Sequence, residues 1–356
     1  MMATTIRKAG LFLLILLIAC WGNAQTLQQA APFHIGMAID PKLLANTDAY
    51  RHVVDTETNS ITSENTLKWP SVHPSQYIFD FEGGDKLLSY AISHHKRFHG
   101  HCLAWHESIP DWVKHFKGDS SAWENLLKTH INTVVGHYKG KITSWDVVNE
   151  AFNSENAYRG TTLTTNNKNE GSLWAEHLGN GFIARAFQYA HEADPKALLF
   201  YNEYGMEYKP GKLKAVVTMA NQFKKNHVPI NGLGIQMHIN INTPKNGITE
   251  ALKQLAATGL LVHISELDIC ANTKGGASVE YSDSIKAAQA AMFAYVVKEY
   301  KTLVPKAQQY GITFWNVSDA DSWIVNWEEK QDWPLLFDTN YQKKSCYYSF
   351  LNALKK

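Results

Sequence analysis

The sequence predicts a single-domain (β/α)8 TIM barrel, and three observations carry this prediction. The chain has 356 residues, a length that suits one barrel of this kind. Short apolar runs alternate with longer segments of helical periodicity, and there are eight such runs. Two of the runs end in a glutamate, Glu150 and Glu266. Because barrels carry their chemistry at the C-terminal ends of the strands, we expect the active site there.

Eight segments are expected to be strands. Ile142, just before the fourth segment, and Val147 and Val148 within it are β-branched, as in a strand buried on both faces of a parallel sheet. Pro41 follows the first strand and suits the first turn of a helix. The expected strands are 34–39, 60–65, 97–103, 145–150, 197–201, 232–238, 260–266 and 311–315.

Helical segments separate these strands. Serines at the start of 121–138 can cap a helix, and Gly259 can end one. The expected helices are 85–96, 121–138, 182–192, 212–226, 249–257, 284–300 and 344–354. The longest irregular segment, 153–180, is expected to be a loop at the barrel mouth.

Residues 1–25 are expected to be a secretory signal. A basic pair, Arg7 and Lys8, precedes an apolar run at 11–19 that is too short to span a bilayer. Two cleavage sites remain open. The small residues before Gln25 suit ordinary signal peptidase, whereas the residues up to Cys20 resemble a bacterial lipobox, which would lipid-anchor the protein through Cys20. Either site predicts an exported protein, secreted or periplasmic, with residues 26–356 forming the catalytic domain.

Composition excludes some partners and cofactors. Formal net charge is +1, so a nucleic-acid partner is not expected. Cys102, Cys270 and Cys346 lack metal-ligand spacing, and we expect them to be small apolar residues without a disulfide. No cluster of histidine, aspartate or glutamate has metal-ligand spacing, so no metal and no cofactor are expected.

Two glutamates delivered by separate strands to one barrel mouth are what two-carboxylate glycoside hydrolysis requires. One carboxyl must be protonated to act as an acid, and the other must be ionised. Eleven tryptophans and sixteen histidines suit a cleft that stacks on sugar rings and hydrogen-bonds their rims. A single glutamate at a strand end more often caps a helix or forms a salt bridge, so the pair carries the hypothesis.

Several motifs follow one another in a specific order over about residues 36–338. They are Ser63-Glu64-Asn65 with Lys68-Trp69, His101 with Trp105-His106, Pro110-x-Trp112, Trp145-Asp146-Val147-Val148-Asn149-Glu150, Gln236-x-His238, Ser265-Glu266-Leu267-Asp268, Trp315-x-Val317-Ser318-Asp319, Ser322-Trp323 and Pro334-Leu335-Leu336-Phe337-Asp338. In this combination the chain resembles the family-ten glycoside hydrolases, chiefly endo-β-1,4-xylanases.

The resemblance implies a role for each matching residue. Glu150 would be the general acid/base and Glu266 the nucleophile of a retaining, endo-acting enzyme on xylan or xylooligosaccharides. The substrate-binding residues it implies are Glu64, Asn65, Lys68, His101, Trp105, Asn149, Tyr204, Gln236, His238, Trp315 and Trp323. Of these, His238 would orient Glu266, and Asn149 would bind a sugar 2-hydroxyl. Asn202 is also expected to line the cleft. The family implies a monomer without a protein partner.

Three residues depart from the family pattern. Ser108 stands where glutamine is usual, Asn316 where glycine is usual, and Ile324 where arginine is often found. The last two are expected to reshape the lip of the cleft. Two other functions stay open: hydrolysis of another β-1,4-glycan such as cellulose or mannan, and sugar binding or sensing by a barrel that has lost catalysis. Retention of both glutamates argues against the second.

Overall fold

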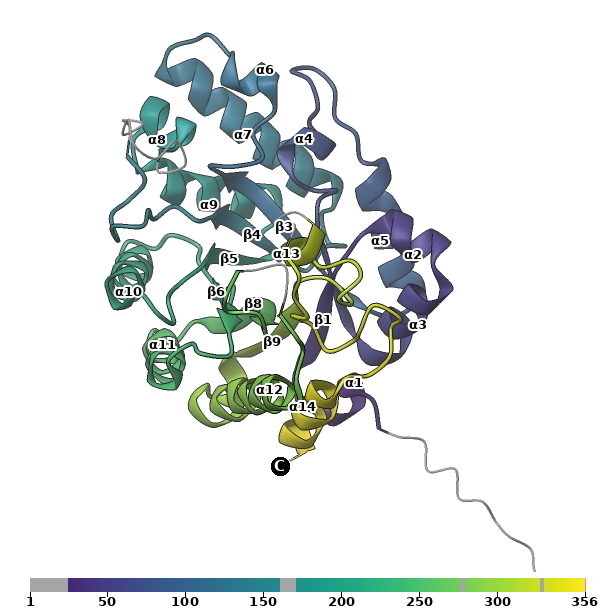
Figure 1. The fold of residues 1–356 in the computed structure, drawn as a ribbon. Coiled ribbons are helices and arrows are strands. Elements are labelled where there is room, and N and C mark those ends of the chain that lie inside the picture. The colour runs from purple at the N-terminus through teal and green to yellow at the C-terminus, as the bar shows by residue number, and fades with distance from the viewer. Residues whose placement is uncertain (1–24, 161–170, 276–278, 327–329, 356) are drawn as a thin grey trace, which may run out of the picture.

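The computed structural model describes residues 25–160, 171–275, 279–326 and 330–355. Within these residues, eight parallel strands close into a barrel: β1 (His34–Ile39), β2 (Ser60–Ser63), β3 (Arg97–Trp105), β4 (Ser144–Asn149), β5 (Leu198–Glu203), β6 (Gly232–Ile235), β8 (Leu261–Cys270) and β9 (Gln309–Phe314). β1 pairs with both β2 and β9, and the ring closes where β6 pairs with β8 (Figure 1). The predicted (β/α)8 barrel is confirmed.

The sixth predicted strand, 232–238, is divided in the structure. β6 ends at Ile235, and a separate strand, β7 (His238–Asn240), pairs only with the outer end of β8. Met237 lies between them with φ 61°. A left-handed residue interrupts an extended strand, so the chain turns there and presents Gln236 and His238 at the barrel mouth.

Long helices surround the barrel (Figure 1). They are α3 (Asp48–Glu57), α5 (Glu82–Ser93), α7 (Ser120–His137), α9 (Phe182–Ala193), α10 (Pro210–Lys225), α11 (Lys245–Ala257), α12 (Asp283–Leu303) and α14 (Ser345–Lys355). In α7, Trp123, Leu127, Ile131 and Val134 are buried, at the spacing of one helical face. The Asp119 side chain caps this helix by accepting a hydrogen bond from Ala122 N at 2.9 Å.

Short helices fill the connections, and most of them were not predicted. They are α1 (Leu27–Ala30), α2 (Pro41–Asn46), α4 (Trp69–Val72), α6 (Asp111–Lys114), α8 (Leu173–Leu178) and α13 (Trp323–Asn326). Only α2 was expected, from Pro41, because four to six residues are too few to show a helical period. α8 corrects the prediction of an entirely irregular segment at 153–180.

Two predictions fall outside the described residues. Apart from Gln25, the expected signal segment is not described, and neither are residues 161–170 of the expected mouth loop. Across the residues that are described, no helix combines the length and the apolar character needed to cross a membrane.

The strand that carries Glu150 packs closely against its neighbour. Gly100 of β3 lies opposite Trp145 of β4, and the buried indole covers the glycine. A Cβ added to Gly100 would lie 2.2 Å from Trp145 Cε3. A larger residue at this position therefore requires the Trp145 indole to shift.

We predict that Gly100→Ala lowers the free energy of unfolding by about 1–3 kcal/mol, because the buried indole must shift. Gly136→Ala is the matched control. Gly136 lies exposed in α7, and a Cβ added there would meet no atom within 4 Å, so this change should raise stability by about 0.5–1 kcal/mol. Urea denaturation of both variants tests the pair. Equal stability of Gly100→Ala and wild type would contradict the close packing.

Candidate active site

One cleft of about 1160 Å³ opens at the C-terminal ends of the barrel strands. The thirteen side chains that the sequence assigns to catalysis or substrate binding line it: Glu64, Asn65, Lys68, His101, Trp105, Asn149, Glu150, Tyr204, Gln236, His238, Glu266, Trp315 and Trp323. These residues come from eight strands, β2 to β9, or from the connections after them. The closed sheet therefore gathers them, since parallel strands deliver their carboxyl ends to the same rim.

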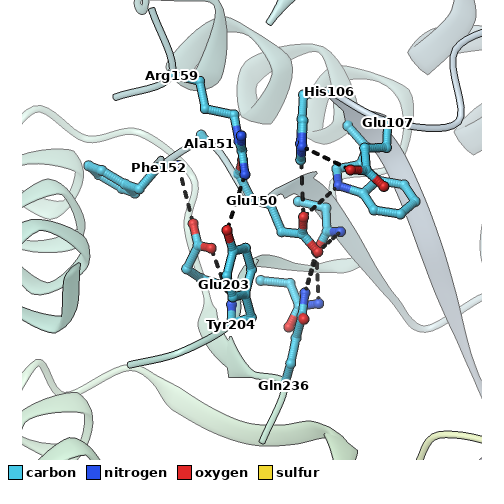
Figure 2. Close-up of polar contacts among 12 residues, drawn as sticks. His106, Glu107, Glu150, Ala151, Phe152, Arg159, Glu203, Tyr204 and Gln236 are labelled. Carbon is cyan, nitrogen blue, oxygen red and sulfur yellow. Dashed lines mark hydrogen bonds and ion pairs between the residues drawn. The ribbon is translucent and has the colours of Figure 1, made fainter. Parts of the chain in front are cut away.

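Glu150 lies in the turn directly after β4 and reaches into the cleft with 12% of its side chain exposed. Its Oε2 accepts a hydrogen bond from Trp105 Nε1 at 2.9 Å. Its Oε1 accepts from Gln236 Nε2 at 2.9 Å and from Asn149 Nδ2 at 3.2 Å. Figure 2 shows this carboxylate between His106 and Gln236, and His106 Nδ1 lies 3.9 Å from Oε2. The direct hydrogen-bond donors are all neutral.

Glu266 lies on β8 and is almost fully buried. Its Oε1 accepts from Asn202 Nδ2 at 2.6 Å, and its Oε2 accepts from His238 Nε2 at 3.2 Å. Burial by itself raises the pKa of Glu266, but the hydrogen bond from His238 and the charges of His101 and His238 outweigh burial and lower that pKa. Glu266 is therefore held as a carboxylate.

His238 owes its charge to Asp268. His238 Nδ1 donates to Asp268 Oδ2 at 2.6 Å, and Trp323 Nε1 donates to the same oxygen at 2.9 Å. Burial alone lowers the pKa of His238, but the Asp268 and Glu266 carboxylates hold it well above its usual value. With both ring nitrogens protonated, His238 can donate to both carboxylates at once.

Asn202 joins the surroundings of the two glutamates. Besides Glu266, its Nδ2 donates to Asn149 Oδ1 at 2.9 Å, and Asn149 in turn donates to Glu150. We expected Asn202 in the cleft lining, but it is completely buried beneath the cleft. The reason is that it lies inside the barrel at the end of β5, where its amide replaces water as the partner of Glu266.

His101 is supported from within the barrel. His101 Nδ1 contacts Asp146 Oδ2 at 2.9 Å, and His99 Nε2 lies 3.0 Å from the same oxygen. Burial opposes protonation, but Cys102 and Asp146 hold the pKa of His101 well above its usual value. His101 thus adds a positive charge that favours the ionised form of Glu266.

A second polar group lies beside the carboxylates, on the β2 side of the cleft. Lys68 Nζ donates to Asn65 Oδ1 at 3.0 Å and lies 5.2 Å from the ring centroid of Trp105 and 5.7 Å from that of Trp315. Burial raises the pKa of Glu64, and the Asn316 amide and the Lys68 ammonium oppose this only in part. Aromatic faces with alternating donors and acceptors suit a polyhydroxylated ligand.

Several cleft residues were not predicted. They include Asp40, Leu43, Glu107, Arg159, Tyr208, Asp321 and Tyr341. Asp40 follows β1 directly, so its place at a strand end could have indicated it. Arg159 and Tyr208 lie in connections without periodicity or a spacing rule, and only the folded chain brings them to the cleft.

The three departures from the family pattern have different positions. Ser108 lines the cleft, with φ 49°. Asn316 is buried with φ 87°, and its Oδ1 accepts from Trp323 N at 2.9 Å, so it fixes the start of α13. Ile324 was expected at the lip, but it is only 2% exposed and does not line the cleft. Trp323 on the same short helix faces the cleft instead.

Among the described residues, no group of three or more His, Cys, Asp or Glu side chains could hold a metal ion. Cys102 and Cys346 are buried free thiols, and Cys270 is a partly buried one. What the cleft offers is a buried ionised carboxylate, a second carboxylate bonded by neutral donors, and aromatic walls. This arrangement can perform nucleophilic attack and proton transfer on a sugar.

Comparison with known protein families and sequences finds relatives that are named for the hydrolysis of polysaccharides or belong to such a family. The family model described as glycosyl hydrolase family 10 matches residues 23–353. "Exoglucanase XynX" of Acetivibrio thermocellus is 35% identical over 337 residues, 91% of this chain and 29% of that protein. "Beta-1,4-xylanase" of Dictyoglomus thermophilum is 34% identical over 331 residues, 90% of this chain and 88% of that protein. The chain spans less than a third of the length of the first two curated relatives.

Solved structures give the same result. A mutant of xylanase 10C from Cellvibrio japonicus, in complex with xylopentaose, superposes with a TM-score of 0.86 at 32% identity. The match covers 94% of this chain and 69% of that chain. The described site and these similarities lead to one family.

We predict that Asp268→Asn moves the titration of His238 to lower pH, because the variant removes the opposite charge that favours the imidazolium. The stabilisation from protonated His238 is present below its ordinary pKa and is lost as pH rises through its raised folded-state pKa. In the variant, this loss occurs at lower pH. Side-chain NMR of His238 measures the shift. Asp119→Asn, which changes an exposed helix cap outside the cleft lining, is the control. An unchanged titration of His238 in Asp268→Asn would refute the assignment.

Proposed function

The chain belongs to glycosyl hydrolase family 10, and from this we propose that it is an endo-1,4-β-xylanase acting as a monomer. It cleaves internal β-1,4-xylosidic bonds of xylan with retention of anomeric configuration. The observation that carries the proposal is the pair Glu150 and Glu266, which lie in one cleft with unequal surroundings. A cationic histidine and a buried amide hold Glu266, whereas Glu150 receives neutral donors only.

These surroundings support a division of roles in double displacement. In the first step, the ionised Glu266 attacks the anomeric carbon, the glycosidic C–O bond breaks, and Glu150 transfers its proton to the departing oxygen. In the second step, Glu150 takes a proton from water, the water oxygen bonds to the anomeric carbon, and Glu266 leaves. The lowered pKa of Glu266 supports its role as the nucleophile.

The other cleft residues are proposed to bind the chain of sugars. Asn149 is suited to the 2-hydroxyl of the sugar being cleaved, because its amide already contacts Glu150. Trp315 and Trp323 offer indole faces for stacking. The Glu64, Asn65 and Lys68 group supplies donors and acceptors for neighbouring hydroxyls.

The size of the cleft supports endo action. Its volume of about 1160 Å³ lies above the roughly 300–1,000 Å³ of pockets that hold one drug-sized ligand. Several sugar units therefore fit beside the two carboxylates, as attack on internal bonds requires. The relative crystallised with xylopentaose is consistent with a multi-sugar site of this kind.

Another β-1,4-glycan is the second candidate substrate. One relative at 35% identity bears the name exoglucanase. Glucose differs from xylose by a hydroxymethyl group at C5, so the choice depends on the space beside the cleft walls. The mechanism would stay the same.

Export is also proposed. The basic pair Arg7 and Lys8 and the apolar run at 11–19 support a signal function for residues 1–25. Cleavage before Gln25 would release a soluble enzyme, whereas processing at Cys20 would leave it lipid-anchored. Both would place the enzyme outside the cytoplasm, with access to a polymer too large to enter the cell.

We predict that wild type releases reducing sugar from glucuronoxylan and arabinoxylan, and that Glu266→Ala loses about 10⁴-fold or more in kcat, because the attacking group is gone. Carboxymethyl-cellulose and mannan are assayed beside them. Glu250→Ala, a change to an exposed glutamate on α11, is the control and should keep full activity. Cleavage of cellulose or mannan alone would show that the substrate is that polymer and not xylan. If wild type released no reducing sugar from any of the four polymers, the proposed enzymatic activity would be rejected.

We also predict that the first product formed has the β-anomeric configuration, because two inversions at the same carbon retain it. Time-resolved proton NMR of xylohexaose hydrolysis measures the anomer before mutarotation. Initial appearance of the α-anomer would contradict the nucleophilic role of Glu266.

A further inference from the structure

The backbone of the turn that carries Glu150 is held largely by side chains from distant parts of the chain. Glu150 has φ 57°, a left-handed conformation that is costly for a residue with a side chain. All six backbone N–H and C=O groups of residues 150–152 are hydrogen-bonded. Glu150 N donates to Asn202 O at 2.9 Å, and Ala151 O accepts from Arg159 N at 2.8 Å. The four other groups bond to side chains.

Four side chains make those bonds. Glu150 O accepts from Arg159 Nε at 2.6 Å. Ala151 N donates to Tyr201 Oη at 2.9 Å, and Phe152 N donates to Glu203 Oε2 at 3.2 Å. Phe152 O accepts from Lys212 Nζ at 3.4 Å. In Figure 2, Arg159 and Glu203 lie beside Ala151 and Phe152, to the left of the Glu150 carboxylate.

Tyr201, Glu203 and Lys212 form one buried cluster. Tyr201 Oη donates to Glu203 Oε2 at 2.6 Å, and Lys212 Nζ donates to Glu203 Oε1 at 3.0 Å. Tyr201 and Glu203 lie on β5 and Lys212 on α10, and none of the three is exposed to solvent. The cluster therefore ties the Glu150 turn to a strand and to a helix.

Stability alone does not account for this cluster. The Lys212–Glu203 ion pair has 0% exposure on both sides, and an apolar pair is often at least as stable in such a place because burying two charges costs free energy. A polar cluster in which every group is hydrogen-bonded holds its members in a single geometry. Here the cluster also fixes the position of the backbone next to the Glu150 side chain, because it bonds to Ala151 and Phe152.

We propose that Tyr201, Glu203 and Lys212 are positioning residues for proton transfer: they fix the backbone of residues 150–152 and so aim the Glu150 carboxyl at the departing oxygen. This inference rests on the proposed function. None of the three touches the sugar in this role; each acts through the backbone next to Glu150.

The cluster also contacts the cleft wall. Lys212 Nζ lies 3.5 Å from the ring centroid of Tyr204, and Arg159 Nη2 donates to Tyr204 Oη at 3.4 Å. Tyr204 and Arg159 both line the cleft. A sugar that packs on Tyr204 would therefore contact a side chain that itself contacts Lys212 and Arg159, two of the residues that hold the Glu150 turn.

The test separates proton transfer from the rest of catalysis by the choice of leaving group. Dinitrophenolate leaves without protonation, whereas a sugar hydroxyl or phenol needs the acid. Tyr201→Phe removes only the hydroxyl that bonds Ala151 N and Glu203. We expect it to lower kcat/KM for phenyl β-xylobioside and xylohexaose by about tenfold, and to change kcat/KM for dinitrophenyl β-xylobioside by less than about twofold.

A second readout follows the second step. With dinitrophenyl β-xylobioside, kcat depends on Glu150 as the base that activates water. Azide attacks the glycosyl-enzyme without a base, forming a C–N bond as Glu266 departs. In Tyr201→Phe the Glu150 carboxylate is still present and repels the azide anion, so the rescue is measured in Glu150→Ala, where added azide should raise kcat. Adding Tyr201→Phe to Glu150→Ala should leave the rescued kcat nearly unchanged, whereas a general weakening of the fold would lower it.

Tyr300→Phe is the matched control. Tyr300 is also a fully buried tyrosine whose hydroxyl donates to a backbone oxygen, Val262 O at 2.7 Å, and accepts from a backbone amide, Gly311 N at 3.1 Å. It does not line the cleft. We expect any change in kcat/KM to be the same for activated and unactivated substrates.

The double variant Glu203→Gln/Lys212→Met removes both charges of the ion pair, so that neither charge is left buried without its partner. It provides a second test if Tyr201→Phe folds poorly. It should show the same leaving-group dependence and, when added to Glu150→Ala, the same azide response. Equal losses on all substrates, or no loss on any, in both variants would overturn the positioning role. If wild type hydrolyses none of the xylosides, the proposed function fails instead.

Discussion

The Asn202 amide is the contact on which the rest of the site depends. From the end of β5 it donates to Asn149 on β4 and to Glu266 on β8, while its Oδ1 accepts from Ser265 Oγ at 2.6 Å. The amide is fully buried, so water cannot take its place. Because Asn149 bonds Glu150, one side chain relates the positions of both glutamates. Closure of the barrel brings the strand ends near one another, but the Asn202 amide orients the side chains of Asn149 and Glu266 relative to each other.

The two carboxylates have unequal surroundings because their hydrogen-bond donors differ in charge. Glu266 has the His238 imidazolium, whose charge is maintained by Asp268, and it is an ion for that reason. The donors to Glu150 are an indole and two amides, and none of them carries a charge. Charged groups at this density are costly to bury, and the cost is met by pairing each with a partner. The site therefore depends on the hydrogen bonds of Asn202, His238 and Asp268 beneath the cleft as much as on the cleft residues themselves.

Much of the site could be predicted because its chemistry lies at strand ends. Glu150, Gln236 and Trp315 follow apolar runs, and their order along the chain resembles that of a known family. Residues without such a signal were missed. Tyr201 and Lys212 read as ordinary core and helix-surface positions, yet both bond the backbone beside Glu150. Their role depends on contacts between β5, α10 and the turn after β4, and no local pattern encodes a contact between distant segments.

The sequence by itself determined the barrel and its strand order in the chain, and its resemblance to a known family indicated thirteen of the side chains that line the cleft. Alternation of apolar runs and helical periods is a local property, and closure of eight parallel strands then gathers their ends. The tertiary structure decided which way individual side chains face. It buries Ile324 and Asn202, and it places a left-handed residue, Met237, between β6 and β7. It also brings the buried Lys212–Glu203 ion pair to the turn that carries Glu150. Which way a side chain faces depends on packing against segments far along the chain, and that packing exists only once the barrel has closed.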